Sequence, residues 1–213
     1  MSSSSTSIER TSFDCLSISG KEYKMGKFKF IETGIKDLYV IEPTVFGDNR
    51  GYFMETYNDE FKPYIKHLDG TPAEFVQDNQ SKSKKGVLRG LHFQKKNPQG
   101  KLVRCLEGEV YDVAVDLRKD SETYGKWYGV LLSEENKKQF YIPEGFAHGF
   151  AVYTETATFA YKCPRLYDPT DEGGIMWNDP DIGVDWNIPE GMEVLLSEKD
   201  KKNKSFKELG FSF

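Results

Sequence analysis

Short β-prone runs, separated by turn residues at close intervals, are the feature that most restricts the fold of this chain. Runs of four to nine residues, rich in Val, Ile, Tyr and Phe and bounded by Gly, Pro, Asn or Asp, are typical of strands. The runs cover residues 38–45, 51–57, 74–79, 86–93, 102–106, 109–117, 127–132, 139–142, 149–153 and 156–162. Their close succession, with no repeat of fixed period, predicts an all-β sandwich or barrel rather than a propeller or a solenoid.

The clearest strand alternates along residues 110–117. Tyr111 begins a face that is otherwise Val, Val and Leu, whereas Asp112 and Asp116 belong to the opposite face. Side chains in a strand point alternately to its two sides. We therefore expect one face of this strand to join the core and the other to meet something polar.

Helical signals are few. Residues 59–66 predict a short helix capped by Asn58, and residues 198–209 predict another in the tail. Together with the strands, this favours a cupin-type jelly-roll β-barrel with a few short helices, in a single domain that spans residues 25–213. Residues 1–24 are Ser-rich and lack a sustained apolar period, so they are expected to form a flexible leader, with Met25 a candidate for the natural start.

Charge and cysteine content restrict the class of function. The chain has 213 residues and a net charge of −5, which argues against nucleic-acid binding. Its three cysteines are far apart and form no C-x-x-C pair, which predicts neither a disulfide framework nor a zinc site. Neither a membrane helix nor the apolar core of a signal peptide is visible, so we expect no membrane contact and a cytoplasmic location.

Four polar residues interrupt strand-like sequence between positions 75 and 94. They are Gln77, Asn79, Arg89 and His92. Polar side chains within strands need a hydrogen-bond partner or a ligand, so the four indicate either an internal network or a ligand site inside the barrel. Arg89 and His92 are three residues apart and would face opposite sides of a regular strand. If both line one cavity, Gly90 should mark a bulge or bend.

A metal centre is not expected. Many cupin barrels bind a metal through His-x-His together with a Glu and a later His, but here Phe93 and Gln94 follow His92. Only His67 and His148 remain, and His67 lies in a charged segment where a surface position is expected. His92 is therefore better suited to acid–base work than to metal ligation, although a lone histidine on a strand is also compatible with a structural role.

Several long motifs, in unbroken order from about residue 28 to residue 200, resemble the dTDP-4-dehydrorhamnose 3,5-epimerase family. They are VFGDNRGYFME at 45–55, the segment 75–94, QGKLVR at 99–104, GEVYDVAVDLR at 108–118, IPEGFAHGF at 142–150 and WNDP at 177–180. The resemblance implies a homodimeric, metal-free jelly roll that needs no cofactor. It also implies inversion of carbons 3 and 5 of a dTDP-linked 4-keto-6-deoxyhexose, in dTDP-L-rhamnose biosynthesis.

The resemblance also implies catalytic roles. His92 matches the base, oriented by Asp200; Lys101 matches the cation at the developing enolate oxygen; and Tyr161 matches the acid on the opposite face. A proton beside a ketone is weakly acidic, so such a site needs all three kinds of group. Without the resemblance, Tyr161 would be interpreted as a core aromatic and Lys101 as an ordinary exposed lysine.

Ten further residues match positions that contact the nucleotide sugar in that family. A guanidinium suits the diphosphate, a tyrosine can stack on thymine, and two of the ten reach the ligand from the neighbouring subunit. The two from the neighbour are Arg50 and Glu55, which on type alone suit a turn ion pair. The others are Gln77, Asp78, Asn79, Arg89, His148, Glu172, Lys199 and Tyr167.

Other functions remain open from the sequence. The pair Leu166–Tyr167 replaces an aromatic pair that many family members carry, which leaves base stacking open. The alternatives are an epimerase of another dTDP-deoxysugar pathway that inverts a single carbon, a sugar-binding cupin without catalysis, and a metal-dependent cupin. A binding protein would not need His92, Asp200 and Tyr161 together, and a metal enzyme would need a ligand triad.

Overall fold

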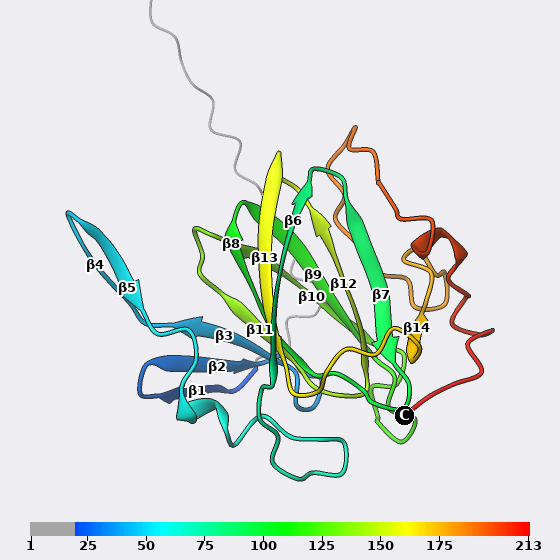
Figure 1. Ribbon diagram of the computed structural model, residues 1–213, viewed down its shortest axis with the longest axis horizontal. Coiled ribbons are helices and arrows are strands. Elements are labelled where there is room, and N and C mark those ends of the chain that lie inside the picture. Colours follow the sequence, from blue (N-terminus) through cyan, green and yellow to red (C-terminus); the bar gives the residue numbers. More distant parts are fainter. Residues whose placement is uncertain (1–19) are drawn as a thin grey trace, which may run out of the picture.

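Two antiparallel sheets packed face to face form the body of the molecule (Figure 1). The structure is a computed structural model and describes residues 20–213. One sheet has the strand order β1 (Glu22–Met25), β2 (Phe28–Glu32), β3 (Tyr39–Pro43), β11 (Gln139–Ile142), β8 (Lys101–Glu107), β13 (Thr156–Cys163) and β6 (Gln77–Lys84). The other has the order β10 (Trp127–Ser133), β9 (Glu109–Asp116), β12 (Phe146–Val152), β7 (Leu88–Gln94) and β14 (Glu172–Gly174).

A separate hairpin, β4 (Val45–Asp48) and β5 (Gly51–Met54), projects from the body (Figure 1). Each predicted run overlaps one of the strands, so the all-β class is confirmed. Strands β1, β2 and β14 were not predicted, nor was β4 beyond its first residue, Val45. Phe28 and Phe30 with Lys29 between them are nevertheless a period-2 signal for β2. Within the described residues, regular structure is already present from Glu22, where β1 begins its pairing with β2, before the leader boundary expected at residue 25; residues 1–19 lie outside the described part.

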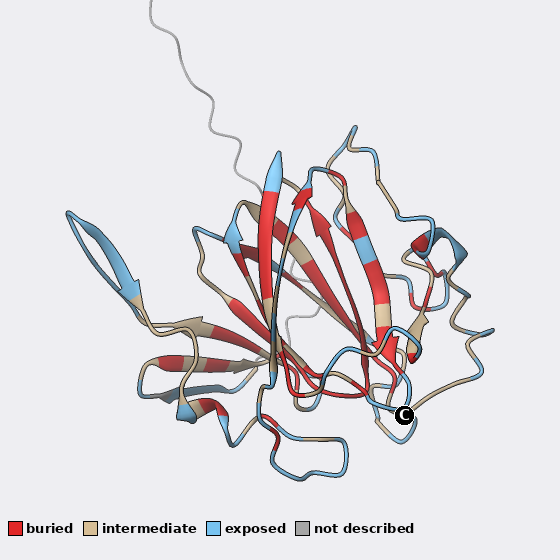
Figure 2. Ribbon diagram, viewed as in Figure 1, coloured by how far each residue is buried: buried red, intermediate tan, exposed pale blue. Residues whose placement is uncertain are grey.

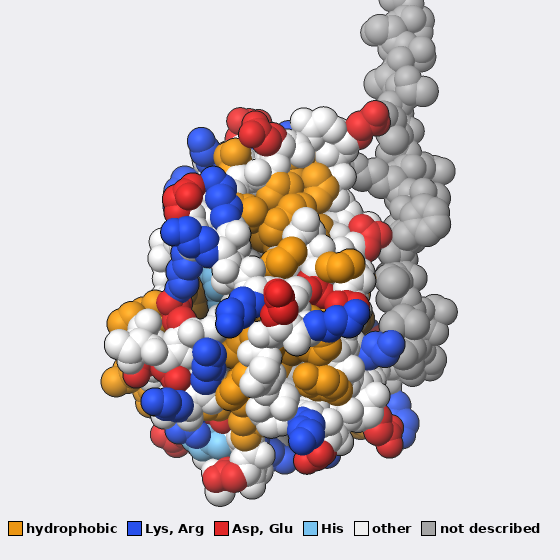
Figure 3. Space-filling model, turned by 90° about the vertical axis from the view of Figure 1, so that its right-hand side faces the viewer, with side chains coloured by type: hydrophobic (Ala, Val, Ile, Leu, Met, Phe, Trp, Pro, Cys, Tyr) orange, Lys and Arg blue, Asp and Glu red, His pale blue; other side chains and the backbone are white. Residues whose placement is uncertain are grey.

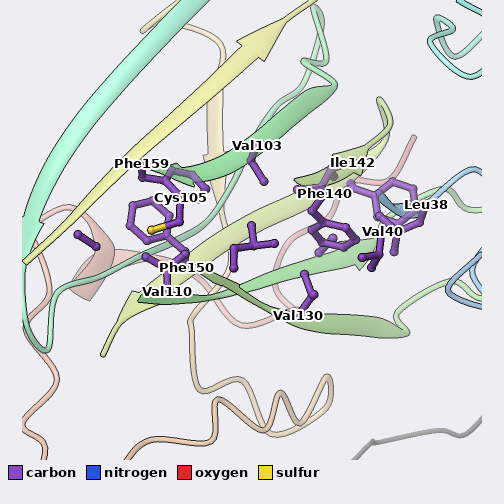
Figure 4. Close-up of a cluster of buried hydrophobic side chains, with 14 of the residues drawn as sticks. Leu38, Val40, Val103, Cys105, Val110, Val130, Phe140, Ile142, Phe150 and Phe159 are labelled. Atoms are coloured by element: carbon purple, nitrogen blue, oxygen red, sulfur yellow. The ribbon is translucent and has the colours of Figure 1, made fainter. Parts of the chain in front are cut away.

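The core between the two sheets is one cluster of buried apolar side chains (Figure 4). It joins residues from facing strands, among them Val103, Phe140, Phe150 and Phe159. Figure 2 shows the buried segments concentrated where the two sheets face each other. Burial of this apolar area is the main stabilising term of such a sandwich, and the cluster defines which side of every strand faces the interior.

Two more clusters cover the outer sides of the sheets. The C-terminal segment packs its aromatic side chains, Phe206, Phe211 and Phe213 among them, against the outer side of β7 and β9. Phe61 and Ile65 pack under β2, β3 and β11. The outer side of β9 thus includes Val113, and both of its sides are buried. One side of the strand does carry the polar residues Asp112 and Asp116, as expected. Both side chains are fully buried, however, so this side does not face solvent.

Both predicted helices are much shorter than expected. Asn58 caps η1 (Asp59–Phe61) by accepting a hydrogen bond from the Glu60 backbone, as predicted, but the helix does not continue, because Pro63 has no backbone N–H to donate to the next helical hydrogen bond. The tail prediction over 198–209 is wrong. Only η2 (Asp200–Lys202) forms, because the tail covers the outer side of the second sheet with its apolar residues instead of coiling on itself.

Candidate active site

Polar side chains continue the inner faces of both sheets beside the apolar cluster. Cross-strand pairing places Tyr161 opposite Asn79 and Val103, and places Lys101 opposite Ile142. Directly paired residues point to the same side of a sheet. Because Val103 and Ile142 belong to the core between the sheets, Tyr161, Asn79 and Lys101 face the interior from the first sheet.

A bulge in β7 brings two predicted site residues to one side of the second sheet. His92 pairs with His148 and Arg89 pairs with Phe150, so β7 has one residue more than β12 in this stretch. His148 and Phe150 point the same way, hence His92 and Arg89 do too. Gly90 occupies the bulge, where its φ is 130° and an added Cβ would lie 2.6 Å from the Cα of Gly149. The bend predicted at Gly90 is confirmed.

His92 is hydrogen-bonded through Nε2 to Asp200 Oδ1. The side chain of His92 is 33% exposed whereas that of Asp200 is 3% exposed, so the ring reaches the cavity and its carboxylate partner does not. Burial by itself would raise the pKa of Asp200, but hydrogen bonds from His92 and Ser197 outweigh it and lower that pKa. A carboxylate held ionised against Nε2–H leaves Nδ1 as the basic nitrogen of His92.

His148 forms a second histidine–carboxylate pair. Its Nε2 lies 3.0 Å and 2.9 Å from the two carboxylate oxygens of Asp112, and both side chains are buried. Burial lowers the pKa of His148, which favours the neutral ring, despite the neighbouring carboxylate. Asp112 was not among the predicted site residues. The polar side of the alternating run at 110–117 was the signal that pointed to it.

Lys101 and Tyr161 face these histidines from the first sheet. Burial lowers the pKa of Lys101, while the neighbouring Cys163 and Asp112 act in the opposite direction. Burial also raises the pKa of Tyr161, which keeps its phenol protonated. The Phe159 ring lies 6.3 Å from the His148 ring and 6.1 Å from the Tyr161 ring, so it links the two sides.

The polar residues Gln77 and Asn79 of β6 and Arg89 of β7 also lie on the inner sides of their sheets. Gln77 donates to Asn79 and accepts from the Tyr167 backbone at 2.8 Å each, which joins the loop that carries Tyr167 to β6. The Arg89 guanidinium is exposed and donates to Ser83 Oγ at 3.2 and 3.3 Å. This leaves most of its five N–H groups available to a ligand.

Glu172 is the next predicted contact around the cavity. It lies on β14, two residues from Gly174, which pairs with His92, and it forms an ion pair with Lys199. Because Glu172 and Gly174 are two apart, Glu172 is on the side of β14 that continues the His92 face. The structure therefore brings Glu172 and Lys199 to the same region as the catalytic candidates.

Three predicted contacts are not brought to the cavity. Asp78 lies between Gln77 and Asn79, so it points to the outer side of the sheet, where it pairs with Lys162 at 2.6 Å. Arg50 is at the tip of the β4–β5 hairpin, 85% exposed and paired with Asp48. Glu55 follows that hairpin and pairs with Lys27. Within one chain, each of these three side chains is therefore held in an ion pair and not placed beside the catalytic candidates.

His67 was expected at the surface, and its side chain is only partly exposed, at 22%, because it is paired with a buried acid. Its Nδ1 lies 2.8 Å from Glu144 Oε1, and the side chain of Glu144 is 1% exposed. Arg165 Nε and the Leu68 backbone also donate to this carboxylate. His67 is therefore one of several groups that satisfy a buried acid and tie the loop at 66–72 to the sandwich.

Within residues 20–213, no group of three or more His, Cys, Asp or Glu side chains is arranged to hold a metal ion. No helix in that part of the chain is long and apolar enough to cross a membrane. On the face shown in Figure 3, acidic and basic side chains lie side by side.

A double-sheet β fold with acid–base side chains on its inner faces is that of a cupin-type enzyme. Residues 32–208 match the family model described as dTDP-4-dehydrorhamnose 3,5-epimerase. The chain belongs to this family, and it is an isomerase that acts on a dTDP-linked sugar.

Individual relatives agree with this assignment. The dTDP-4-dehydrorhamnose 3,5-epimerase of Methanothermobacter thermautotrophicus is 52% identical over 184 residues, which are 86% of this chain and 97% of that protein. The crystal structure of the enzyme from Elizabethkingia anophelis has a TM-score of 0.79 and 55% identity, and the match covers 87% of this chain and 100% of that one. A Legionella pneumophila epimerase in complex with dTDP-4-keto-L-rhamnose has a TM-score of 0.79 and 49% identity, covering 85% and 94%.

Proposed function

We propose that this protein converts dTDP-4-dehydro-6-deoxy-D-glucose to dTDP-4-dehydro-L-rhamnose, and that His92, Asp200, Lys101 and Tyr161 carry out the chemistry. The observation that carries the assignment of roles is the placement of His92 and Tyr161 on the inner sides of two facing sheets. Inversion of a carbon requires that a proton leave on one side and arrive on the other, so a base and an acid on opposite walls are suited to it.

Proton removal falls to His92. Its Nδ1 takes the proton from the carbon beside the C4 carbonyl, first at one of carbons 3 and 5 and then at the other. The Asp200 carboxylate holds Nε2–H and stabilises the imidazolium that forms, which is the general logic of an oriented histidine base. The low pKa of Asp200 supports this role because it keeps the carboxylate charged.

Lys101 and Tyr161 complete the reaction. When the proton leaves, negative charge moves to the oxygen on C4, and the Lys101 ammonium stabilises that oxygen. The Tyr161 hydroxyl then donates a proton to the opposite face of the carbon. Burial of the phenol supports an acid that is protonated at the start of each step.

The nucleotide part of the substrate is assigned to the polar groups of β6 and β7 and their neighbours. Arg89 is positioned for the diphosphate, because a guanidinium fork matches phosphate oxygens. Tyr167 is half exposed and suited to stack on thymine. The remaining candidates for contacts to the ligand are Gln77, Asn79, His148, Glu172 and Lys199.

We further infer a homodimer in which the β4–β5 hairpin of one subunit reaches the cavity of the other. Four large apolar side chains of this hairpin, Val45, Phe46, Tyr52 and Phe53, are between 42% and 64% exposed. Apolar patches of this kind on a projecting element are typical of a protein–protein contact. In the dimer, Arg50 and Glu55 would contribute to the partner's site, and Asp78 lies on an outer face open to such a partner. The proposal places a single domain, residues 25–213, in the cytoplasm.

Incorporation of solvent deuterium tests the proposed reaction. The protein is incubated in D₂O with dTDP-4-keto-6-deoxyglucose, and the sugar is analysed by NMR. Deuterium should enter at both carbon 3 and carbon 5. Incorporation at one carbon only would establish a single-carbon epimerase instead, and incorporation at the enzyme-free rate would exclude epimerisation of this sugar.

A further inference from the structure

Asp112 is a fully buried carboxylate on the inner side of the second sheet, and the proposed reaction assigns it no role. It lies on β9, opposite Phe150 on β12 and Val130 on β10. Both of those residues belong to the apolar cluster between the sheets, so Asp112 faces the first sheet. A buried carboxylate is costly unless it is hydrogen-bonded and its charge is compensated, which raises the question of what compensates it.

One partner of Asp112 is His148, which engages both carboxylate oxygens through Nε2. Burial lowers the pKa of His148, which favours a neutral ring that donates its Nε2–H, although the Asp112 carboxylate acts in the opposite direction. A neutral ring satisfies hydrogen bonds of the carboxylate but supplies no positive charge. In that form of the pair, compensation of the charge has to come from another group.

Lys101 is the cation that faces Asp112. It lies on the inner side of β8, across the space between the sheets. Within residues 20–213, no ion pair holds its ammonium, and Asp112 and Cys163 are the neighbours that raise its pKa against the effect of burial. Lys101 in turn favours the charged form of Asp112, whose pKa burial raises. Each of the two groups thus stabilises the other's charge.

We propose that Asp112 is a positioning residue for the epimerisation, one that fixes the orientation of His148 and supplies the negative charge that keeps the Lys101 ammonium protonated inside the cavity. The inference rests on the proposed role of Lys101 at the enolate oxygen. A lysine buried without a counter-charge loses its proton at lower pH, and a neutral amine could not stabilise the enolate. Asp112 therefore determines how far into the alkaline range the site stays active.

Other titratable groups face the same space and bear on the test. They are Cys163 and Tyr161 on β13, His148 on β12, and His92 with Arg89 on β7. Burial raises the pKa of Cys163 and of Tyr161, so both are neutral near neutral pH. Burial raises the pKa of Asp112 too, but its ordinary pKa of 3.8 is far below the 9.0 of a cysteine and the 10.0 of a tyrosine, and His148 and Lys101 both act against the shift. Of these acids, Asp112 is therefore the one suited to carry the negative charge opposite Lys101.

Titration of Lys101 in the intact protein tests the proposal without any substrate. The protein is labelled with ¹³C at lysine Cε, and the Lys101 signal is identified by its loss in Lys101→Met. In Asp112→Asn, which keeps the shape of the side chain but removes its charge, the midpoint of Lys101 should fall by about 1 to 3 pH units. The fall of kcat at alkaline pH should likewise shift to lower pH in this variant, while KM changes little. An unchanged Lys101 midpoint in folded Asp112→Asn would overturn the proposal.

Asp116→Asn is the matched control. Asp116 lies on the same strand and is equally buried, but its partners are Arg118, Ser121 and Thr123. Loss of this carboxylate damages stability in a comparable way without removing charge from the cavity, so the Lys101 midpoint should stay where it is in the wild type. A shift as large as that in Asp112→Asn would mean that general loosening, and not the Asp112 charge, is responsible.

A second variant keeps the test valid if Asp112→Asn does not fold. Coupling between two sites is reciprocal, so Lys101→Met should raise the pKa of Asp112 by as much as the loss of Asp112 lowers that of Lys101. The ¹³C signal of the Asp112 carboxyl group measures this, and no change would contradict the proposal. Failure of the proposed function is distinguished separately, because it would show as absence of deuterium incorporation by the wild-type protein.

Discussion

His92 and His148 lie directly opposite each other on β7 and β12, and each is hydrogen-bonded to a buried carboxylate from a different part of the chain. Asp200 comes from the tail and Asp112 from β9. The two pairs differ in exposure, since the His92 side chain is 33% exposed and that of His148 is 8% exposed. The exposed ring is suited to take a proton from a substrate, and the buried ring to hold one orientation in the cavity wall.

Replacing the base should stop exchange at both carbons. His92→Ala removes the only ring nitrogen proposed to take a proton, so deuterium incorporation should fall roughly 100- to 10,000-fold at carbon 3 and at carbon 5. NMR of the sugar measures both positions in one sample, and circular dichroism checks that the fold is intact. A folded variant that still exchanges at one carbon would show that another group serves as base there.

Replacing the acid should separate the two halves of the reaction. Tyr161→Phe keeps the aromatic packing against Phe159 but removes the hydroxyl. Inverted product should fall by roughly 100-fold or more, whereas some proton abstraction by His92 should continue and be visible as exchange with retention. Equal loss of exchange and of product would count against Tyr161 as the acid.

The Asp200 carboxylate should make stability depend on acid pH. Its pKa in the folded protein is lowered from the ordinary value of 3.8, so its contribution is fully present above that value and is lost as the pH falls through the folded pKa. The free energy of unfolding should therefore decrease in this acid window, and less steeply in Asp200→Asn. Urea unfolding at a series of pH values measures it; identical slopes for the two proteins would exclude the effect.

The glycine in the β7 bulge should tolerate no side chain. Gly90→Ala places a Cβ against the Gly149 backbone at a positive φ, which should cost about 1 to 3 kcal/mol and disturb the common orientation of Arg89 and His92. Gly51→Ala is a matched control, because Gly51 has a φ of 137° with no atom within 4 Å of the added Cβ. Urea unfolding should show the larger loss for Gly90→Ala; equal losses would mean that φ alone matters.

Two inactive subunits should restore each other if the hairpin serves the partner's site. A dimer that combines His92→Ala with Arg50→Ala has one site with both native residues and one with neither. Co-expression should therefore give about a quarter of the wild-type number of intact sites when the subunits combine at random. Activity no higher than that of the separately purified variants would place Arg50 in its own subunit's site or outside any site.

The all-β class and the assignment of site residues to strands followed from local patterns. Alternation along residues 110–117 and the turn residues between runs are properties of a few neighbouring positions, and the physical reason is that side chains in a strand alternate with a period of two. The same period, combined with the spacing of Arg89 and His92, predicted the bend at Gly90. The capping of η1 by Asn58 is likewise a contact between near neighbours.

Tertiary structure decided everything that depends on contacts between distant segments. The predicted tail helix gave way to packing against the second sheet, because burying Phe206 and Phe211 there outweighs local helix preference. His67 found a buried partner in Glu144, 77 positions away. The pairing of Asp112 with His148 requires that β9 and β12 lie side by side in one sheet, and the position of Asp112 facing Lys101 requires that the two sheets stack. The sequence alone thus determined which residues are available for acid–base chemistry, and the stacking of the sheets determined which of them share a cavity.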